Sequence, residues 1–173
     1  MEKMEENKMT KAEKIKLAME TARNAQIRDD ICARSVLVGL KEIMDIPEEM
    51  ITASMSLAGG GGGGAGSCGA YSCGLLGVGL KFNVPLEEEL KDQSLQEIGA
   101  AKFNEYRDRF LAEMGTVLCP GVHQKVFGRS FYFTDPAQAE EFMSLEGHEV
   151  TCGDVVALAT RIAAEMILAD EED

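Results

Sequence analysis

The segment that decides the fold spans residues 58–74 and reads AGGGGGGAGSCGAYSCG. Six consecutive glycines, Gly59 to Gly64, have a large conformational entropy to lose on folding, so they cannot form regular structure. Ser67 can cap a helix of small residues that we expect over residues 68–81. The glycines inside this helix each cost about 1 kcal/mol relative to alanine, so tertiary contacts must hold it. The segment therefore predicts an irregular loop followed by a closely packed helix.

Helical periodicity flanks this segment on both sides. Six further helices are expected, over residues 9–25, 29–45, 47–57, 85–114, 136–145 and 153–169. Asp29 or Asp30 can cap the second of them. Residues 116–134 are the least helical part and predict a short hairpin or an aromatic plug. Because strands and helices do not alternate, the sequence predicts an all-α, single-domain helical bundle. We divide it into an N-terminal helix (1–28), a cysteine-containing domain (29–169) and an acidic tail (170–173).

Composition and charge narrow the function classes. The chain of 173 residues is 45% hydrophobic and 27% charged, which is ordinary for a folded protein. Its net charge is −13, which disfavours binding to nucleic acid or to an anionic membrane surface. Residues 1–16 are densely charged and lack the apolar stretch of a signal peptide. We therefore expect a cytoplasmic protein, in which cysteines are not structural disulfides.

Cys68 is the most informative of the five cysteines. At the predicted start of a helix, free amide groups and the helix dipole lower the pKa of a thiol, and the thiolate is the form that attacks disulfides or binds metals. Backbone amides beside it can form a nest for a cofactor, for which we expect Gly63, Gly64, Ser67 and Gly69. A flexible linker with an ordinary buried thiol is the alternative interpretation.

The other cysteines are dispersed singly along the chain. Cys73 is five residues after Cys68, about 140° around a helix axis, so the two thiols would not share a face. Cys32 lies on an apolar helical face, where a packed core thiol is the default interpretation. Cys119 is expected in an exposed turn after the long helix, and Cys152 at the start of the last helix.

Together these residues resemble a known family. Cys32, the glycine run with Cys68-Gly69-Ala70, Cys119 and Cys152 resemble the redox-active protein family named for its C-GCAxxG-C-C pattern. The same module is similar to the C-terminal part of split-Soret cytochrome c. The resemblance covers residues 25–169 and implies a helical, homodimeric protein of anaerobic metabolism. It further implies that these four cysteines are the redox or iron–sulfur positions. Cys73 departs from the pattern, which usually has glycine there, and supplies an extra thiol.

The remaining motifs give weaker evidence of function. No C-x-x-C-H segment is present, so covalent c-type haem is not expected. His123 and His148 are possible axial or metal ligands, but hydrogen-bonded structural histidines are the more common case. The glycine run contains GxGxxG without a surrounding βαβ unit, which argues against dinucleotide binding.

Three function hypotheses remain open at this point. The first is an electron-transfer protein that holds an iron–sulfur cluster, or another thiolate-bound metal, and serves an unidentified redox partner. The second is a thiol–disulfide redox protein or sensor with Cys68 as the attacking thiolate. The third is a helical interaction module with incidental cysteines.

Overall fold

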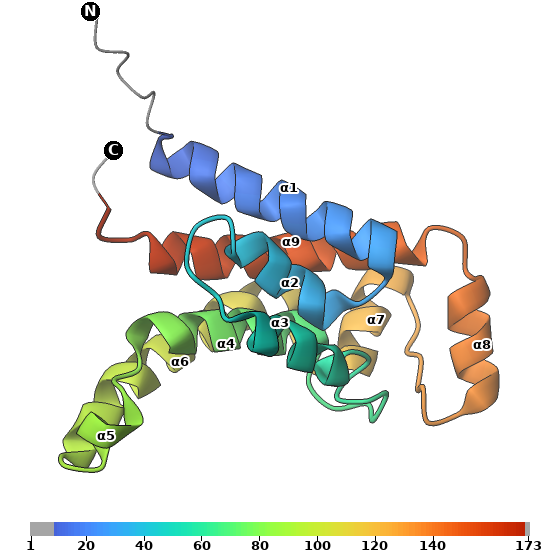
Figure 1. Ribbon diagram of the computed structural model, residues 1–173. Coiled ribbons are helices and arrows are strands. Elements are labelled where there is room, and N and C mark those ends of the chain that lie inside the picture. Colours follow the sequence, from blue (N-terminus) through green and yellow to red (C-terminus); the bar gives the residue numbers. More distant parts are fainter. Residues whose placement is uncertain (1–8, 172–173) are drawn as a thin grey trace, which may run out of the picture.

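The computed structural model describes residues 9–171, which form helices joined by loops and contain no β-strand (Figure 1). The predicted all-α class is confirmed. The charged residues Met1–Lys8 and the end of the acidic tail, Glu172 and Asp173, lie outside the described residues. No described helix combines the length and the apolar character needed to cross a membrane. The elements are α1 (Lys11–Asp29), α2 (Cys32–Leu40), α3 (Glu48–Ser54), η1 (Met55–Leu57), α4 (Gly69–Phe82), α5 (Leu86–Glu89), η2 (Gln93–Leu95), α6 (Gln96–Met114), α7 (Cys119–Phe127), α8 (Pro136–Ser144) and α9 (His148–Ile167).

The core of the bundle consists of α1, α2, α4 and α9. Figure 1 shows α1 and α9 side by side, with α2 and α4 beneath them, while α5 and the start of α6 extend away from the body. Small residues permit the close approach of α1 and α2. Ala18 and Ala22 are fully buried, and a methyl group on Gly39 would overlap the Ala18 carbonyl oxygen. At the far end of α1, Arg23 donates to Asp154 of α9 at 2.7 Å.

The glycine segment has the irregular form that the sequence predicts. Gly59 through Gly63 all have positive φ, between 57° and 82°, which residues with a Cβ rarely adopt. The expected cap of the following helix is wrong. Cys68 is the N-cap of α4, because Ser67 forms an isolated β-bridge with Leu118 and so remains outside the helix.

Three predicted helix boundaries are also wrong, each for a local reason. Asp30 caps the C-terminal end of α1 in the left-handed conformation and does not begin α2. The expected helix from Pro85 to Met114 is broken, because Asp92 is extended and its side chain accepts a hydrogen bond from the Ser94 amide. The last helix begins at His148, where Gly147 adopts a positive φ of 77°.

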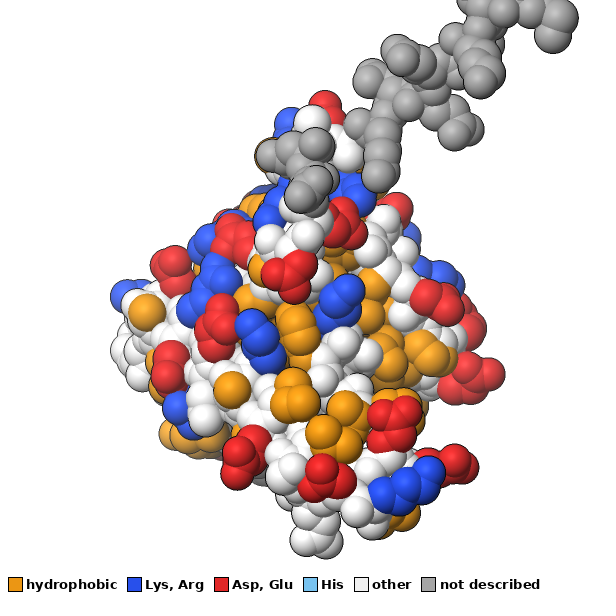
Figure 2. Space-filling view, turned by 90° about the vertical axis from the view of Figure 1, so that its left-hand side faces the viewer, with side chains coloured by type: hydrophobic (Ala, Val, Ile, Leu, Met, Phe, Trp, Pro, Cys, Tyr) orange, Lys and Arg blue, Asp and Glu red, His pale blue; other side chains and the backbone are white. Residues whose placement is uncertain are grey.

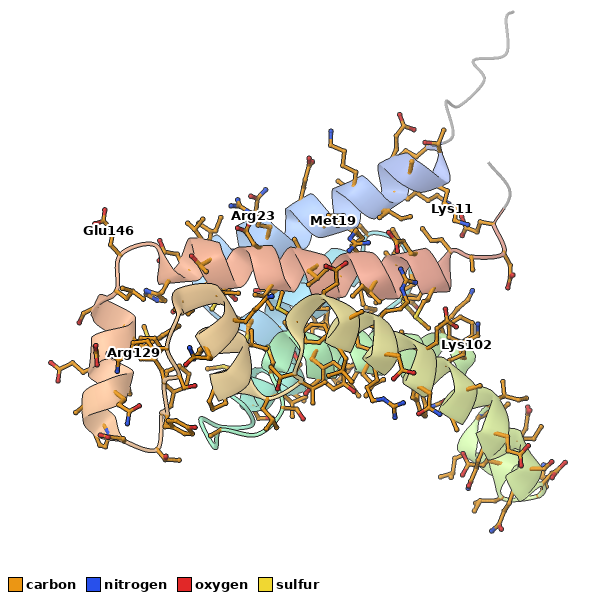
Figure 3. All side chains as sticks on the ribbon, turned by 180° about the vertical axis from the view of Figure 1, so that it is seen from behind. Lys11, Met19, Arg23, Lys102, Arg129 and Glu146 are labelled. Carbon is orange, nitrogen blue, oxygen red and sulfur yellow. The ribbon has the colours of Figure 1, made fainter. Side chains whose placement is uncertain are left out.

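The segment from 116 to 134 contains no hairpin. Instead it forms α7, followed by a loop whose phenylalanines fill the space under α8, so the aromatic plug is the correct alternative. Arg129, labelled in Figure 3, lies over the Phe131 ring at 4.5 Å and pairs with Glu141 of α8. These contacts hold α8 against the loop.

Charges are mixed on the part of the surface that Figure 2 shows. Lysine and arginine side chains are scattered there among aspartate and glutamate, and do not form a continuous basic stripe.

We expect Gly39→Ala to destabilise the protein by about 1–3 kcal/mol, because the added methyl group overlaps α1 at Ala18 and Ala22. Urea unfolding measures this change. The matched control is Gly79→Ala in α4, where the nearest neighbour of a new Cβ is the Asn83 side chain at 3.3 Å. Helix propensity should make that change neutral or stabilising by up to about 1 kcal/mol. Equal effects of the two substitutions would contradict the packing account.

A second prediction concerns His148, which joins the start of α9 to the end of α1. Its Nε2 lies 2.9 Å from Asp30 Oδ2, its Nδ1 lies 2.7 Å from the Leu145 carbonyl oxygen, and Glu149 is 3.5 Å away. Burial lowers the pKa of His148, but these hydrogen bonds and acidic neighbours together raise the pKa above 6.5. The resulting stabilisation is complete below pH 6.5 and is lost as the pH rises through the raised pKa.

We therefore expect the free energy of unfolding to fall from pH 6.5 upward in the wild-type protein by more than in His148→Gln. Denaturant unfolding at several pH values up to 8 measures both slopes. Parallel pH profiles of the two proteins would show that the Asp30–His148 pair does not contribute.

Candidate functional site

Four of the five cysteines line one cavity of about 240 Å³. They come from four different elements: Cys32 begins α2, Cys68 caps α4, Cys119 begins α7 and Cys152 lies one turn into α9. The rest of the wall is mostly apolar and comprises Gln26, Asp30, Ala58, Gly59, Gly63, Ala70, Val122, His123, Phe133, Phe142, Met143 and Val155. All five thiols are free. Cysteines up to 120 positions apart in the chain thus share one enclosure.

Backbone pairing brings Cys68 and Cys119 to the cavity. The Cys68 amide donates to the Val117 carbonyl at 2.7 Å, and the Cys119 amide donates to the Gly66 carbonyl at 2.8 Å. These two bonds flank the Ser67–Leu118 bridge and connect the start of α4 to the start of α7. The starts of two helices therefore open onto the same space.

Gly69 brings Cys32 to the same place. A Cβ at this position would lie only 2.8 Å from Cys32 Sγ and 3.1 Å from the Ala33 Cβ. Any larger residue would therefore separate the first turn of α4 from the first turn of α2. The glycine after Cys68 is needed for the approach of two cysteines, a role in packing that differs from the expected contact with a cofactor.

The other residues expected in the cofactor nest divide into two groups. Gly63 lines the cavity, and so does Gly59, which the sequence analysis did not single out. Gly64 and Ser67 are not among the lining residues. Ser67 instead lines a separate shallow groove with Tyr71 and Phe103. The isolated bridge at Ser67 explains this difference, because it holds the residue on the outer side of the loop.

Cys73 is the thiol that does not line the cavity. It is fully buried, and this burial raises the pKa of Cys73 to about 12, an effect that the Ser54 side chain at the end of α3 opposes only in part. This separation from Cys68 agrees with the predicted angle of about 140° between the two positions on a helix. The extra thiol is thus placed apart from the other four.

Burial controls the protonation of the cysteines. It raises the pKa of Cys68 to about 12. The amides of Ala70 and Tyr71 lower this pKa but offset only part of the rise. The expected lowering of the Cys68 pKa is therefore wrong for the metal-free protein. Burial also raises the pKa of Cys32, Cys119 and Cys152, and a thiolate at Cys32 would oppose ionisation of each of the other three. Cys119 is only 5% exposed, contrary to its expected place in an exposed turn.

Backbone amides nevertheless point at two of the sulfur atoms. The Cys32 sulfur accepts hydrogen bonds from the backbone of Gly59, Ala33 and Ala70. The backbone amides of Ala70 and Tyr71 donate to the Cys68 sulfur. Hydrogen bonds of this kind stabilise negative charge on sulfur.

The two histidines have different environments. His148 has both ring nitrogens hydrogen-bonded, to Leu145 and Asp30, as expected of a structural histidine. His123 lines the cavity, and its Nε2 lies 3.7 Å from Cys119 Sγ. The sequence makes His123 a possible axial or metal ligand, with a structural histidine as the more common case. Its spacing of four residues from Cys119 places both side chains on one helical face.

The sulfur atoms surround the cavity and do not converge on one point. Within residues 9–171, no three histidine, cysteine or acidic side chains lie close enough together to hold a single metal ion. Two buried polar atoms of residues that line the cavity, Gln26 Oε1 and His123 Nδ1, have no hydrogen-bond partner. The arrangement is a mostly apolar chamber with soft donors on several sides.

Comparison with known proteins identifies the module. The model of the family described as "Putative redox-active protein (C_GCAxxG_C_C)" matches residues 31–166, which include all five cysteines. No curated protein and no solved structure gives a significant match. The match spans well over half of the chain and supports a redox role for the cysteines. The protein belongs to the C-GCAxxG-C-C family of redox-active proteins.

Proposed function

We propose that the protein is an electron-transfer protein in which Cys32, Cys68, Cys119 and Cys152 hold an iron–sulfur cluster. The observation that carries this proposal is the gathering of these four dispersed cysteines, without Cys73, around one cavity of about 240 Å³. Such a cluster would supply one-electron chemistry when bound. A separate redox partner would deliver or accept the electron.

The donor set supports a cluster over a single zinc ion. Thiolates are soft ligands that suit iron–sulfur clusters, zinc or copper(I). Structural zinc requires four ligands in a tetrahedron about one point. The described side chains provide no such convergence, and four sulfur atoms distributed around a chamber suit a cofactor with several metal atoms.

The chain's own residues contribute a surrounding that stabilises bound thiolates. The amides of Gly59, Ala33 and Ala70 donate to the Cys32 sulfur, and those of Ala70 and Tyr71 to the Cys68 sulfur. These bonds favour the more negative, reduced state of a cluster. Phe133, Phe142 and Met143 contribute apolar side chains to the cavity wall.

Thiol exchange by Cys68 is less well supported. An attacking thiol works best with a pKa near the ambient pH and needs access to its substrate. Cys68 is 6% exposed, and burial raises its pKa to about 12. Metal binding resolves the same problem, because a metal cation displaces the thiol protons and compensates the buried negative charge.

The proposal predicts a coloured protein when it is purified without oxygen. Iron and acid-labile sulfide should be present in comparable amounts, with visible absorption that bleaches on reduction. Elemental analysis and absorption spectroscopy measure both. A colourless, iron-free protein that also fails anaerobic reconstitution would overturn the proposal.

Serine variants test which cysteines are ligands. We expect Cys32→Ser, Cys68→Ser, Cys119→Ser and Cys152→Ser each to weaken iron retention at least 10-fold, because each removes a soft donor. Cys73→Ser is the control, since this thiol is fully buried but lies outside the cavity, and it should retain wild-type iron and sulfide. Loss of iron in the Cys73 variant, with retention in two or more of the others, would refute the assignment.

A further inference from the structure

His123 and Cys119 form a close pair on α7. The two residues are four positions apart, so their side chains leave the helix on the same face. His123 Nε2 lies 3.7 Å from Cys119 Sγ, a distance at which nitrogen and sulfur share a hydrogen bond. Both residues line the cavity. The imidazole is therefore placed at the sulfur of one proposed ligand.

Aromatic rings fix the position of this imidazole. The His123 ring stacks on Phe142, with centroids 4.8 Å apart and an interplanar angle of 17°. The rings of Phe127, Phe131 and Phe133 contact it at steep angles, with centroids between 5.5 and 5.8 Å away. The residue is only 4% exposed. Such a cage leaves the ring little freedom to turn away from Cys119.

The hydrogen between the two atoms can be assigned to one of them. A neutral imidazole carries one N–H hydrogen, which can lie on either ring nitrogen. A sulfur bound to a metal has lost its proton, so the hydrogen between the two atoms must belong to Nε2. Nδ1 is then a bare acceptor, and its lack of a partner leaves no buried N–H unpaired.

We propose that His123 is a positioning residue that donates its Nε2 hydrogen to the Cys119 sulfur and thereby raises the reduction potential of the redox centre. This inference rests on the proposed function. A hydrogen bond to a thiolate is charge-assisted, and it strengthens as the negative charge on sulfur grows on reduction. Removing the donor therefore destabilises the reduced state more than the oxidised state.

The test is a potentiometric titration of the reconstituted protein and three variants. His123→Phe keeps the ring and removes the donor, and we expect the equilibrium constant for reduction to fall about 10-fold, equivalent to about 59 mV for a one-electron couple. His123→Gln retains an N–H donor and should recover part of this shift. Cys73→Ser changes a buried residue outside the cavity and should leave the potential unchanged.

The outcomes separate this inference from the proposed function. Wild-type protein that binds no iron defeats both. A wild-type potential in His123→Phe, with full iron and sulfide, overturns the role of His123 alone. Loss of iron from a folded His123→Phe protein also overturns it, because His123 would then be a ligand.

A second measurement covers the case in which His123→Phe does not fold. Pulsed electron paramagnetic resonance of the reduced wild-type protein, labelled with ¹⁵N-histidine, reports the coupling of the nitrogen to the cluster spin. We expect the weak coupling of a nitrogen that is hydrogen-bonded to a ligand sulfur. Strong coupling from direct coordination, or no coupling, would overturn the inference.

Discussion

The site depends on the backbone pairing between residues 66–68 and residues 117–119. Two hydrogen bonds, from the Cys68 amide to Val117 and from the Cys119 amide to Gly66, connect segments that are about 50 positions apart in the chain. They direct the starts of α4 and α7 toward one space. Gly69 then allows α4 to approach Cys32 of α2, and the packing of α9 against α1, α2 and α4 supplies Cys152. Each of the four thiols thus reaches the cavity through a backbone constraint.

The glycine run makes this pairing possible. Gly59 through Gly63 take positive φ values that let the chain turn tightly between η1 and the bridge at Ser67. The same loop places Gly59, whose amide donates to the Cys32 sulfur, and Gly63 on the cavity wall. Six glycines carry a large entropic cost on folding. This entropic cost arises in the loop that lines the cavity beside the thiols.

Much of the fold could be predicted from the sequence, because helical periodicity and capping residues are local features. The helix predicted to end at residue 114 is an example, because Gly115 ends α6 in the left-handed conformation. The errors arise where a distant contact overrides a local preference. Ser67 is a good cap, but its bridge to Leu118 shifts the start of α4 to the next residue. The aromatic residues after α7 left a hairpin and an aromatic plug as alternatives, and only the distant packing around His123 decides for the plug.

In the site, too, local features could be predicted and the effects of distant contacts could not. The gathering of Cys32, Cys68, Cys119 and Cys152 agrees with what the family resemblance implies, and helical geometry alone separated Cys73 from Cys68. Burial was not predictable from single residues, so the pKa of Cys68 rises where the helix start suggested a fall. The sequence offers His123 as a possible ligand, but its contact with Cys119, one turn earlier on the same helix, was not predicted.

The central claim is that these four thiols hold an iron-containing cluster in the cavity. The most direct test is an anomalous difference map, recorded at the iron absorption edge, from crystals grown without oxygen. The account predicts anomalous density inside the cavity, bordered by the sulfur atoms of the four cysteines and away from Cys73. Crystals of the reconstituted protein that show no iron in the cavity, or iron at another place, would contradict it.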